Sequence, residues 1–451
     1  MIVWFIIMIM LFSKKDLRRI IIPIIFENLL AVSVGMVDTL MVSSAGETAV
    51  SAVSLVDAIN IMFILIFSAL ASGGTVVVSQ YLGKEDRKMA NHAARQLIMI
   101  IFLVSLGIGT LLAISRKALL YLVYGNIDAS IIEAAAVYFL VTAFSYPFLA
   151  LINGSAAIFR AVGKASNSMV CGVLTNVVNV IFNYVFIYIM GMGVLGAALA
   201  TLIGRVLACI LSLFLLTNEN NIVYIKDYRH WSFDFELIGR LLKIAVPSGL
   251  ENGSFQMGKL IIARLISSFG TASISANAIA TSISQIQIIP ANALGIAMLT
   301  VVGRCVGAGR YDQARYYIKR MTFECYLIVW ILGLPILLLL DPLLGLYNVS
   351  SEAIRLARIC SFIHIIGAAI FHPAAYAFPN CLRAANDARY TMIVSTVSMF
   401  TLRVGMSYLL AAFFFPNVLC VYIANAFDWV SRTAFFVGRY LSGKWMNRKL
   451  I

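Results

Sequence analysis

Residues 23–52, PIIFENLLAVSVGMVDTLMVSSAGETAVSA, and residues 247–276, PSGLENGSFQMGKLIIARLISSFGTASISA, decide the fold because they repeat one pattern 224 positions apart. The offset aligns distinctive residues without a gap: Pro23 with Pro247, Glu27 with Glu251, Asn28 with Asn252, Gly46 with Gly270, and Gly83 with Gly307. Chance aligns apolar residues within apolar runs, but it does not align a proline, an acid–amide pair and two glycines in order. The chain is therefore built from two related halves.

The composition places both halves in a membrane. Of the 451 residues, 61% are hydrophobic and only 12% are charged, whereas a soluble domain has about 45–50% apolar and about 25% charged residues. Twelve apolar runs are long enough to span a bilayer, at residues 20–43, 50–78, 94–115, 134–158, 168–190, 196–217, 242–268, 276–302, 318–340, 353–378, 390–414 and 418–437. We expect an all-α integral membrane protein of twelve transmembrane helices, in two six-helix bundles.

These runs predict the domain boundaries. Residues 1–217 form an N-terminal six-helix lobe, within which residues 1–13 are an interfacial segment or an artefact of an upstream start. Residues 218–241 form a cytoplasmic linker, residues 242–440 a C-terminal six-helix lobe, and residues 441–451 a cytoplasmic tail.

The distribution of positive charge predicts the orientation. Most of the lysines and arginines behind the net charge of +14 lie in loops on the side of the N-terminus, and the opposite loops hold little beyond Arg116, Lys117, Arg355 and Arg358. Such clusters mark cytoplasmic loops, so both termini are expected in the cytoplasm. No continuous basic face or recognition module predicts binding to nucleic acid. Because six spans is an even number, the two halves share one orientation, a parallel repeat of the kind found in transporters.

The sequence holds no pattern typical of a catalytic or metal site. Its seven cysteines are isolated, and its four histidines lack metal-ligand spacing. A membrane enzyme needs a nucleophile and base, or a metal site, and neither is recognisable. A channel is disfavoured because the repeat contains unpaired acids and no recognisable filter. We therefore expect a transporter that has no cofactor beyond a coupling ion and is not an enzyme.

An ordered set of motifs resembles the multidrug and toxic compound extrusion (MATE) family over nearly the whole chain after Lys15. The motifs are Val37-Asp38-Thr39, Gly46, Gly83, Phe159 to Lys164, Asn179-x-x-x-Asn183-x-x-Phe186-Ile187, Gly191 to Thr201, Pro247 to Glu251, Val301 to Gly309, Cys381 to Ala384, Arg403, and Asp428-Trp429-x-x-Arg432. The resemblance implies two six-helix bundles that form a V around a central cavity. It also implies export of amphipathic, often cationic compounds in exchange for protons or sodium ions.

Acids inside the predicted spans are the candidate cation-coupling residues, because a charge at the middle of a bilayer is costly and marks function. Asp38 is the leading candidate, and a bound proton or cation would relieve the cost of burying its carboxylate. The resemblance supports it, since one branch of the family uses the corresponding acid. Glu251 follows Pro247, where a kink would free carbonyl oxygens suited to sodium. Glu27 is its counterpart and Asp57 a fourth candidate; Glu27 and Glu251 have a structural alternative as symmetric, hydrogen-bonded acids.

A polar pocket is expected around Asp38. Asn176, Asn179 and Asn183 share one face of the fifth span, either as this pocket or as hydrogen bonds between helices. The resemblance adds Tyr138, Thr201 and Asn153. Some family members carry an acid at the position of Asn183, so a relay between two acids is in doubt here.

Two further charges, Arg403 and Asp428, are expected to be structural or gating charges, with Arg403 paired to an acid or to carbonyl oxygens. We predict a secondary active multidrug efflux antiporter that works by alternating access. It would act as a monomer among the lipids of a bacterial-type plasma (inner) membrane, without a metal beyond a possible sodium site. A lipid-linked oligosaccharide flippase of a related superfamily is the alternative.

Overall fold

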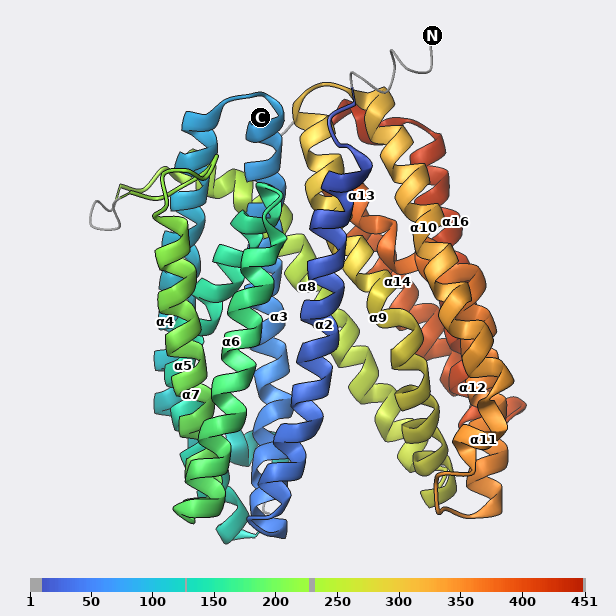
Figure 1. Cartoon of the computed structure of the whole chain (residues 1–451). Helices are drawn as coiled ribbons and strands as arrows, with labels where there is room; N and C mark the ends of the chain where they lie inside the picture. Colours follow the sequence, from blue (N-terminus) through green and yellow to red (C-terminus); the bar gives the residue numbers. More distant parts are fainter. Residues whose placement is uncertain (1–9, 126–127, 227–231, 449–451) are drawn as a thin grey trace. The chain divides into compact units, whose positions relative to one another are not determined.

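The computed structural model describes residues 10–125, 128–226 and 232–448, and in these ranges the regular elements are all helices (Figure 1). Two compact units divide the chain between Ala245 and Val246, with Met10 and Leu11 grouped with the second unit. Residues 1–9 of the predicted N-terminal segment lie outside the described residues. The helices of the first unit are α2 (Lys14–Ser43), α3 (Glu47–Gly83), α4 (Arg87–Tyr124), α5 (Ala129–Ala161), α6 (Ala165–Asn183), η1 (Tyr184–Ile189) and α7 (Gly193–Leu216).

Helix α8 (Phe235–Ser267) begins in the predicted linker and continues into the second unit. The remaining helices of that unit are α9 (Thr271–Gly307), α10 (Tyr311–Leu338), α11 (Leu340–Leu344), α12 (Ser351–His372), η2 (Pro373–Ala377), α13 (Pro379–Ala384), α14 (Ala388–Ser398), η3 (Met399–Gly405), α15 (Met406–Phe413), α16 (Leu419–Leu441) and η4 (Lys444–Asn447). Helix α5 packs on α3, α4 and α7 in the first unit, and α9 packs on α10, α12 and α13 in the second.

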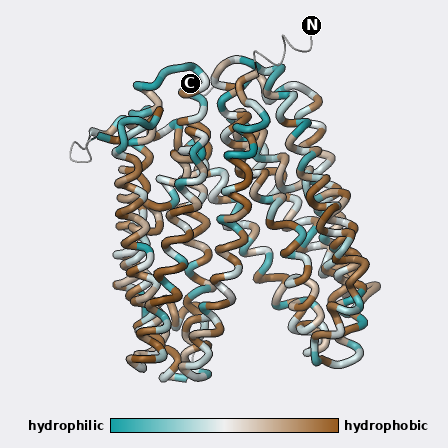
Figure 2. The backbone as a smooth tube through the Cα atoms, viewed as in Figure 1, coloured by the Kyte–Doolittle hydropathy of each residue, from teal (hydrophilic) through white to brown (hydrophobic). Residues whose placement is uncertain are grey.

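Ten of the described helical segments are long and apolar enough to cross a membrane, and Figure 2 shows their apolar middles. The two predicted spans outside this group correspond to α8 and α16. Helix α8 carries Glu251, Lys259 and Arg264 within its length, and α16 carries Asp428 and Arg432. These charges lower the hydropathy of both helices, yet α16 packs against α12, α15 and η3 inside the second unit. The fold is therefore an all-α membrane fold with two sets of six long helical segments.

The repeat is also visible in the backbone, where residues with positive φ recur at matched positions. Gly46 (φ +99°) precedes α3 and Gly270 (φ +87°) precedes α9, and both helices have 37 residues. Farther along, Glu85 and Gly309 have φ values of +62° and +68° at positions 224 residues apart. A left-handed conformation is costly for most side chains, so its recurrence at matched positions shows that the two halves share local structure as well as sequence.

Three π-helical segments interrupt the long helices, and such segments often occur at functional sites. Segment η1 follows Asn183 directly at the end of α6, and η3 follows Ser398 at the end of α14 in the second half. Segment η2 follows His372 at the end of α12. Each of the three therefore changes the helical register beside a polar or ionisable residue inside the membrane.

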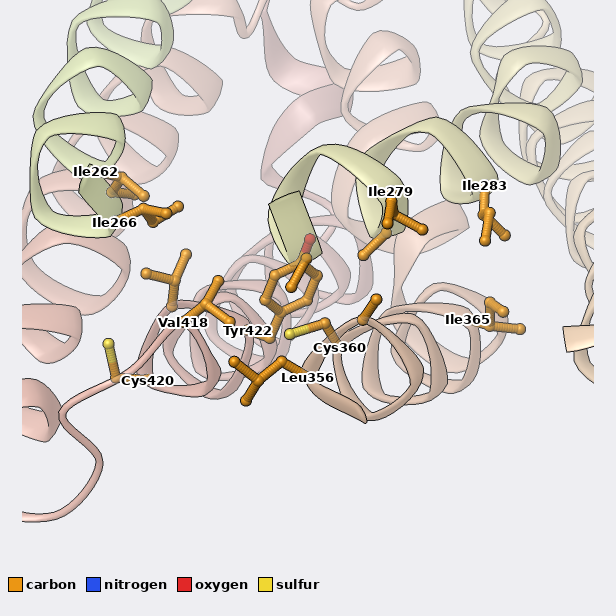
Figure 3. Packing of buried hydrophobic residues seen from close by; sticks show 14 of the residues in the cluster. Ile262, Ile266, Ile279, Ile283, Leu356, Cys360, Ile365, Val418, Cys420 and Tyr422 are labelled. Atoms are coloured by element: carbon orange, nitrogen blue, oxygen red, sulfur yellow. The ribbon is translucent and has the colours of Figure 1, made fainter. Parts of the chain in front are cut away.

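The core of the second unit is an apolar cluster shared by α8, α9, α12 and α16 (Figure 3). Ile262 and Ile266 of α8 are 6% and 4% exposed and lie in this cluster with Ile279 and Tyr422. Ile262 is the repeat counterpart of Asp38. The two halves thus share a backbone pattern but place an apolar side chain where the first half has an acid.

Candidate polar sites inside the membrane

A chain of hydrogen bonds links Asp38 to two other helices. The side-chain amide of Asn183 donates to Asp38 Oδ1 and also lies 3.2 Å from Asn179 Oδ1. Asn179 Nδ2 donates in turn to Thr201 Oγ1 at 3.1 Å. Asn183 is fully buried and Asn179 is 8% exposed. The structure therefore brings Asp38 of α2 together with three of the predicted pocket residues, Asn179 and Asn183 of α6 and Thr201 of α7.

A second chain of hydrogen bonds surrounds Asp57 of α3. Asn60 Nδ2 donates to Asp57 Oδ1 at 3.1 Å, and Tyr138 Oη donates to the same oxygen at 3.5 Å. Tyr146 Oη donates to Asn60 Oδ1 at 2.5 Å. Both tyrosines are buried. Tyr138 therefore lies beside Asp57 rather than in the chain of bonds to Asp38, although the two acids interact electrostatically.

Arg205 of α7 adds a cation that sequence reasoning did not place in the pocket. Its Nη1 donates to Ser145 Oγ at 2.5 Å, and it interacts electrostatically with both Asp38 and Asp57. The signal was present, because Arg205 follows Thr201 by four residues and so shares its helix face. Arg205 carries one positive charge, and Asp38 and Asp57 carry two negative charges when both are ionised. One more positive charge would therefore balance the group.

Two predicted pocket residues are not brought into these networks. Asn153 of α5 and Asn176 of α6 are half-buried, and neither side chain makes a hydrogen bond to another described residue. The asparagines Asn176, Asn179 and Asn183 are therefore not equivalent, since only the two nearest to η1 reach a neighbouring helix.

The other two candidate acids pair with arginines at matching positions of the repeat. Glu251 Oε2 lies 2.7 Å from Arg383 Nη2, and Glu27 Oε1 lies 3.7 Å from Arg160 Nη1. Glu27 Oε2 also accepts a hydrogen bond from Ser168 Oγ at 2.9 Å. Glu251 is 9% exposed. This geometry is the arrangement of symmetric structural acids.

Arg403 and Asp428 belong to one buried network. Asp428 is fully buried, and its Oδ1 accepts from Arg432 Nε at 2.8 Å and from Ser398 Oγ at 2.5 Å. Arg403 Nη1 lies 3.9 Å from Asp428 Oδ2 and donates to Tyr376 Oη at 3.2 Å. A single carboxylate is therefore shared by two arginines.

A cavity of 430 Å³ opens beside this network in the second unit. The residues that line it include Lys259 of α8, Asn277 and Gln285 of α9, His372 of α12 and Arg403 of η3. Sequence reasoning missed this cavity. Its signal is a polar stripe along the apolar helix α9, where Asn277, Thr281, Ser284, Gln285 and Asn292 recur at helical spacing.

The described residues contain no group of three or more His, Cys, Asp or Glu side chains that could hold a metal ion. The carboxylates of Asp38 and Asp57, with amide and phenol oxygens near them, are hard oxygen ligands. The same carboxylates are proton acceptors. Either a proton or a hard monovalent cation thus suits the chemistry of this group.

The duplicated six-helix unit and the acid group within it define the class, a multi-pass α-helical membrane protein of a transporter type. The MatE family model matches residues 23–185 and 247–409, and these two ranges are offset by the same 224 residues as the repeat. The chain belongs to the MatE family.

This chain is similar to known relatives and to a solved structure over nearly its full length. The chain is 26% identical to the uncharacterized transporter YisQ of Bacillus subtilis over 437 residues, 94% of each chain. It is 23% identical to the probable multidrug resistance protein NorM of Thermotoga maritima over 445 residues, 97% of this chain and 94% of that one. A structure of a multidrug resistance MATE family transporter in an outward-facing conformation matches with a TM-score of 0.89 at 18% identity, covering 97% of both chains. That structure has the same fold as this chain.

Proposed function

We propose that the chain is a secondary active multidrug efflux antiporter, which exports amphipathic or cationic organic compounds by alternating access. The observation that carries this proposal is the Asp38 carboxylate, held inside a membrane span by the amide of Asn183. An acid in this position binds either a proton or a cation, and the two occupancies differ in charge. Membership of the MatE family and relatives named as multidrug resistance proteins support the same function.

The coupling ion is a proton or a sodium ion, with Asp38 as its primary ligand. Asp57 interacts electrostatically with Asp38, so a cation at either acid also stabilises the other charge. When a cationic substrate binds again, its positive charge would repel the bound ion and so displace it. The protein would act as a monomer in the lipids of a bacterial-type plasma membrane, with both termini in the cytoplasm and without enzymatic activity, a cofactor or nucleic acid.

A lipid-linked oligosaccharide flippase is the second candidate. The observation that favours it is the cationic wall of the cavity in the second unit, where Lys259 and Arg403 would suit a phosphate-bearing lipid. The acids of the first unit favour the antiporter, because a flippase of an anionic lipid has no use for a cation-binding carboxylate.

Everted membrane vesicles from expressing cells test the proposal. Ethidium accumulation is recorded while a pH gradient and a sodium gradient are imposed separately. We expect one gradient to drive accumulation, and the matching ionophore to collapse it. Accumulation that needs neither gradient, or transport of a lipid-linked oligosaccharide in place of ethidium, would count against the antiporter.

A further inference from the structure

The cavity of the second unit has an unbalanced charge. Lys259 and Arg403 line it, and among the described residues its wall holds no aspartate or glutamate. The carboxylate of Asp428, outside the wall, is already bound to Arg432 at 2.8 Å and lies 3.9 Å from Arg403. Lys259 contacts the ring of Phe255, with 4.9 Å from Nζ to the ring centre, and has no carboxylate partner in the part of the chain that the structure describes. Of the two cations in the wall, only Arg403 has a described carboxylate within 4 Å, and it shares that carboxylate with Arg432.

The wall also holds buried polar atoms that lack partners. His372 is 3% exposed and its Nδ1 makes no hydrogen bond, and Asn425 is 4% exposed with an unpartnered Oδ1. Arg403 Nε is likewise buried without an acceptor. Unpartnered buried polar groups are costly, and a bound molecule with acceptor atoms would relieve the cost at Arg403. These groups make the cavity a built polar site rather than a packing defect.

Aromatic rings form the rest of the wall. Tyr376 stacks on His372 with 4.9 Å between ring centres, and its hydroxyl accepts hydrogen bonds from both Arg403 and Trp429 at 3.2 Å. Phe255 lies under the guanidinium of Arg403, 5.1 Å from the ring centre. A volume of 430 Å³ is within the range of small-molecule pockets, about 300–1,000 Å³. The site offers stacking surfaces beside two positive charges.

We propose that this cavity binds an aromatic organic anion, with Lys259 and Arg403 holding its carboxylate and the aromatic side chains holding its ring system. The anion adds one negative charge beside two cations, in a wall whose described residues include no acid. Binding at this site is independent of the proposed export, whereas its use as an export site rests on that proposed function.

Equilibrium dialysis of the purified full chain in phosphatidylcholine nanodiscs tests the proposal, with naphthalene-2-carboxylate and uncharged naphthalene-2-carboxamide as the matched probes. We expect the carboxylate to bind at least about tenfold more tightly, because charge-assisted hydrogen bonds are about twice as strong as neutral ones. Lys259→Gln should weaken carboxylate binding by about as much and leave carboxamide binding unchanged. Lys259→Arg should restore it. Arg264→Gln is the control, because Arg264 lies exposed on the same helix outside the wall.

Three results would overturn the proposal. Equal binding of the two probes would show that charge does not select the ligand, and an equal loss in Arg264→Gln would show a surface effect. Displacement of the carboxylate by phosphatidylglycerol in the nanodiscs would assign the cationic wall to a lipid headgroup instead. Asp38→Asn should keep carboxylate binding, so a failure of the antiport mechanism is distinguishable from a failure of this site. Arg403→Gln should also weaken carboxylate binding, and if this variant fails to fold, the Lys259 variants still decide the outcome.

Discussion

Glu251 Oε2 lies 2.7 Å from Arg383 Nη2, and its repeat counterpart Glu27 pairs with Arg160 at 3.7 Å. Both pairs join the first helix of a half to the motif in which Arg160 or Arg383 is followed by an alanine. Because this ion pair occurs in both halves, we infer that it stabilises the fold that the two halves share. The pairing favours the structural alternative for these two acids, and cation coupling by them stays a prediction.

Arg383→Gln should destabilise the protein strongly, because it leaves the buried carboxylate of Glu251 without its cation. Breaking a buried ion pair costs about 3–5 kcal/mol. Arg160→Gln should cost less, since the side chain of Glu27 is 28% exposed and its pair is longer. Thermal unfolding midpoints in detergent check the order. The double variant Glu251→Gln/Arg383→Gln should regain much of the loss, and no recovery in it would argue against a paired role.

Asn183→Ala should reduce efflux by roughly tenfold or more, because hydrogen bonds to charged groups contribute about 1.5–3 kcal/mol and 1.4 kcal/mol is about tenfold. Asn176→Ala is the matched control, since Asn176 lies on the same helix and makes no side-chain hydrogen bond among the described residues. Initial rates of ethidium transport in everted vesicles, normalised to protein amount, measure both. Equal losses in the two variants would remove Asn183 from the site.

The twelve spans and the repeat were predictable because apolar length and turn residues are local properties of the sequence. The aligned prolines and glycines fixed the offset, and the family model reproduces it. Which side chains form hydrogen bonds between helices is not a local property of the sequence. Asn176, Asn179 and Asn183 all lie in helix α6, but their spacing alone could not show which of the three reaches Asp38.

The cavity of the second unit was missed for a physical reason. Lys259 and Arg403 come from helices 144 residues apart, and neither has a spacing motif that links it to the other. The polar stripe of α9 was readable, but hydroxyl and amide side chains also serve as hydrogen bonds between membrane helices. Only the packed structure shows that this stripe faces an open volume.

A pH-dependent contact lies at the start of α8. Asp234 Oδ1 accepts from the backbone N–H of Leu237 at 3.0 Å, and its Oδ2 lies 3.1 Å from His92 Nε2. The Leu237 hydrogen bond, with a smaller contribution from His92, lowers the pKa of Asp234 below its ordinary value. A lowered pKa stabilises the fold above the unfolded-state value of about 3.9, and this stabilisation is lost as the pH falls through the folded-state pKa.

Asp234→Ala should therefore lower the thermal midpoint at neutral pH and have a progressively smaller effect as the pH falls from about 4 through the folded-state pKa, below which the wild-type carboxyl is protonated in both states. Asp234→Asn should retain part of the stability at neutral pH, because asparagine also caps a helix N-terminus. Midpoints measured in detergent from neutral pH downward give the comparison. A deficit in Asp234→Ala that is constant over the whole range would contradict the charge-dependent part of this contact.

The proposed antiport depends on the Asp38 carboxylate, which would couple ion binding to export. Asp38→Asn removes the charge and keeps the side-chain size, so expression and thermal stability should stay close to wild type. Asp128→Asn is the control, because Asp128 caps α5 at an exposed position and asparagine caps equally well. The decisive measurement is gradient-driven ethidium accumulation in everted vesicles. We expect Asp38→Asn to lose this accumulation and Asp128→Asn to keep it, and wild-type accumulation by Asp38→Asn would exclude Asp38 as the coupling residue.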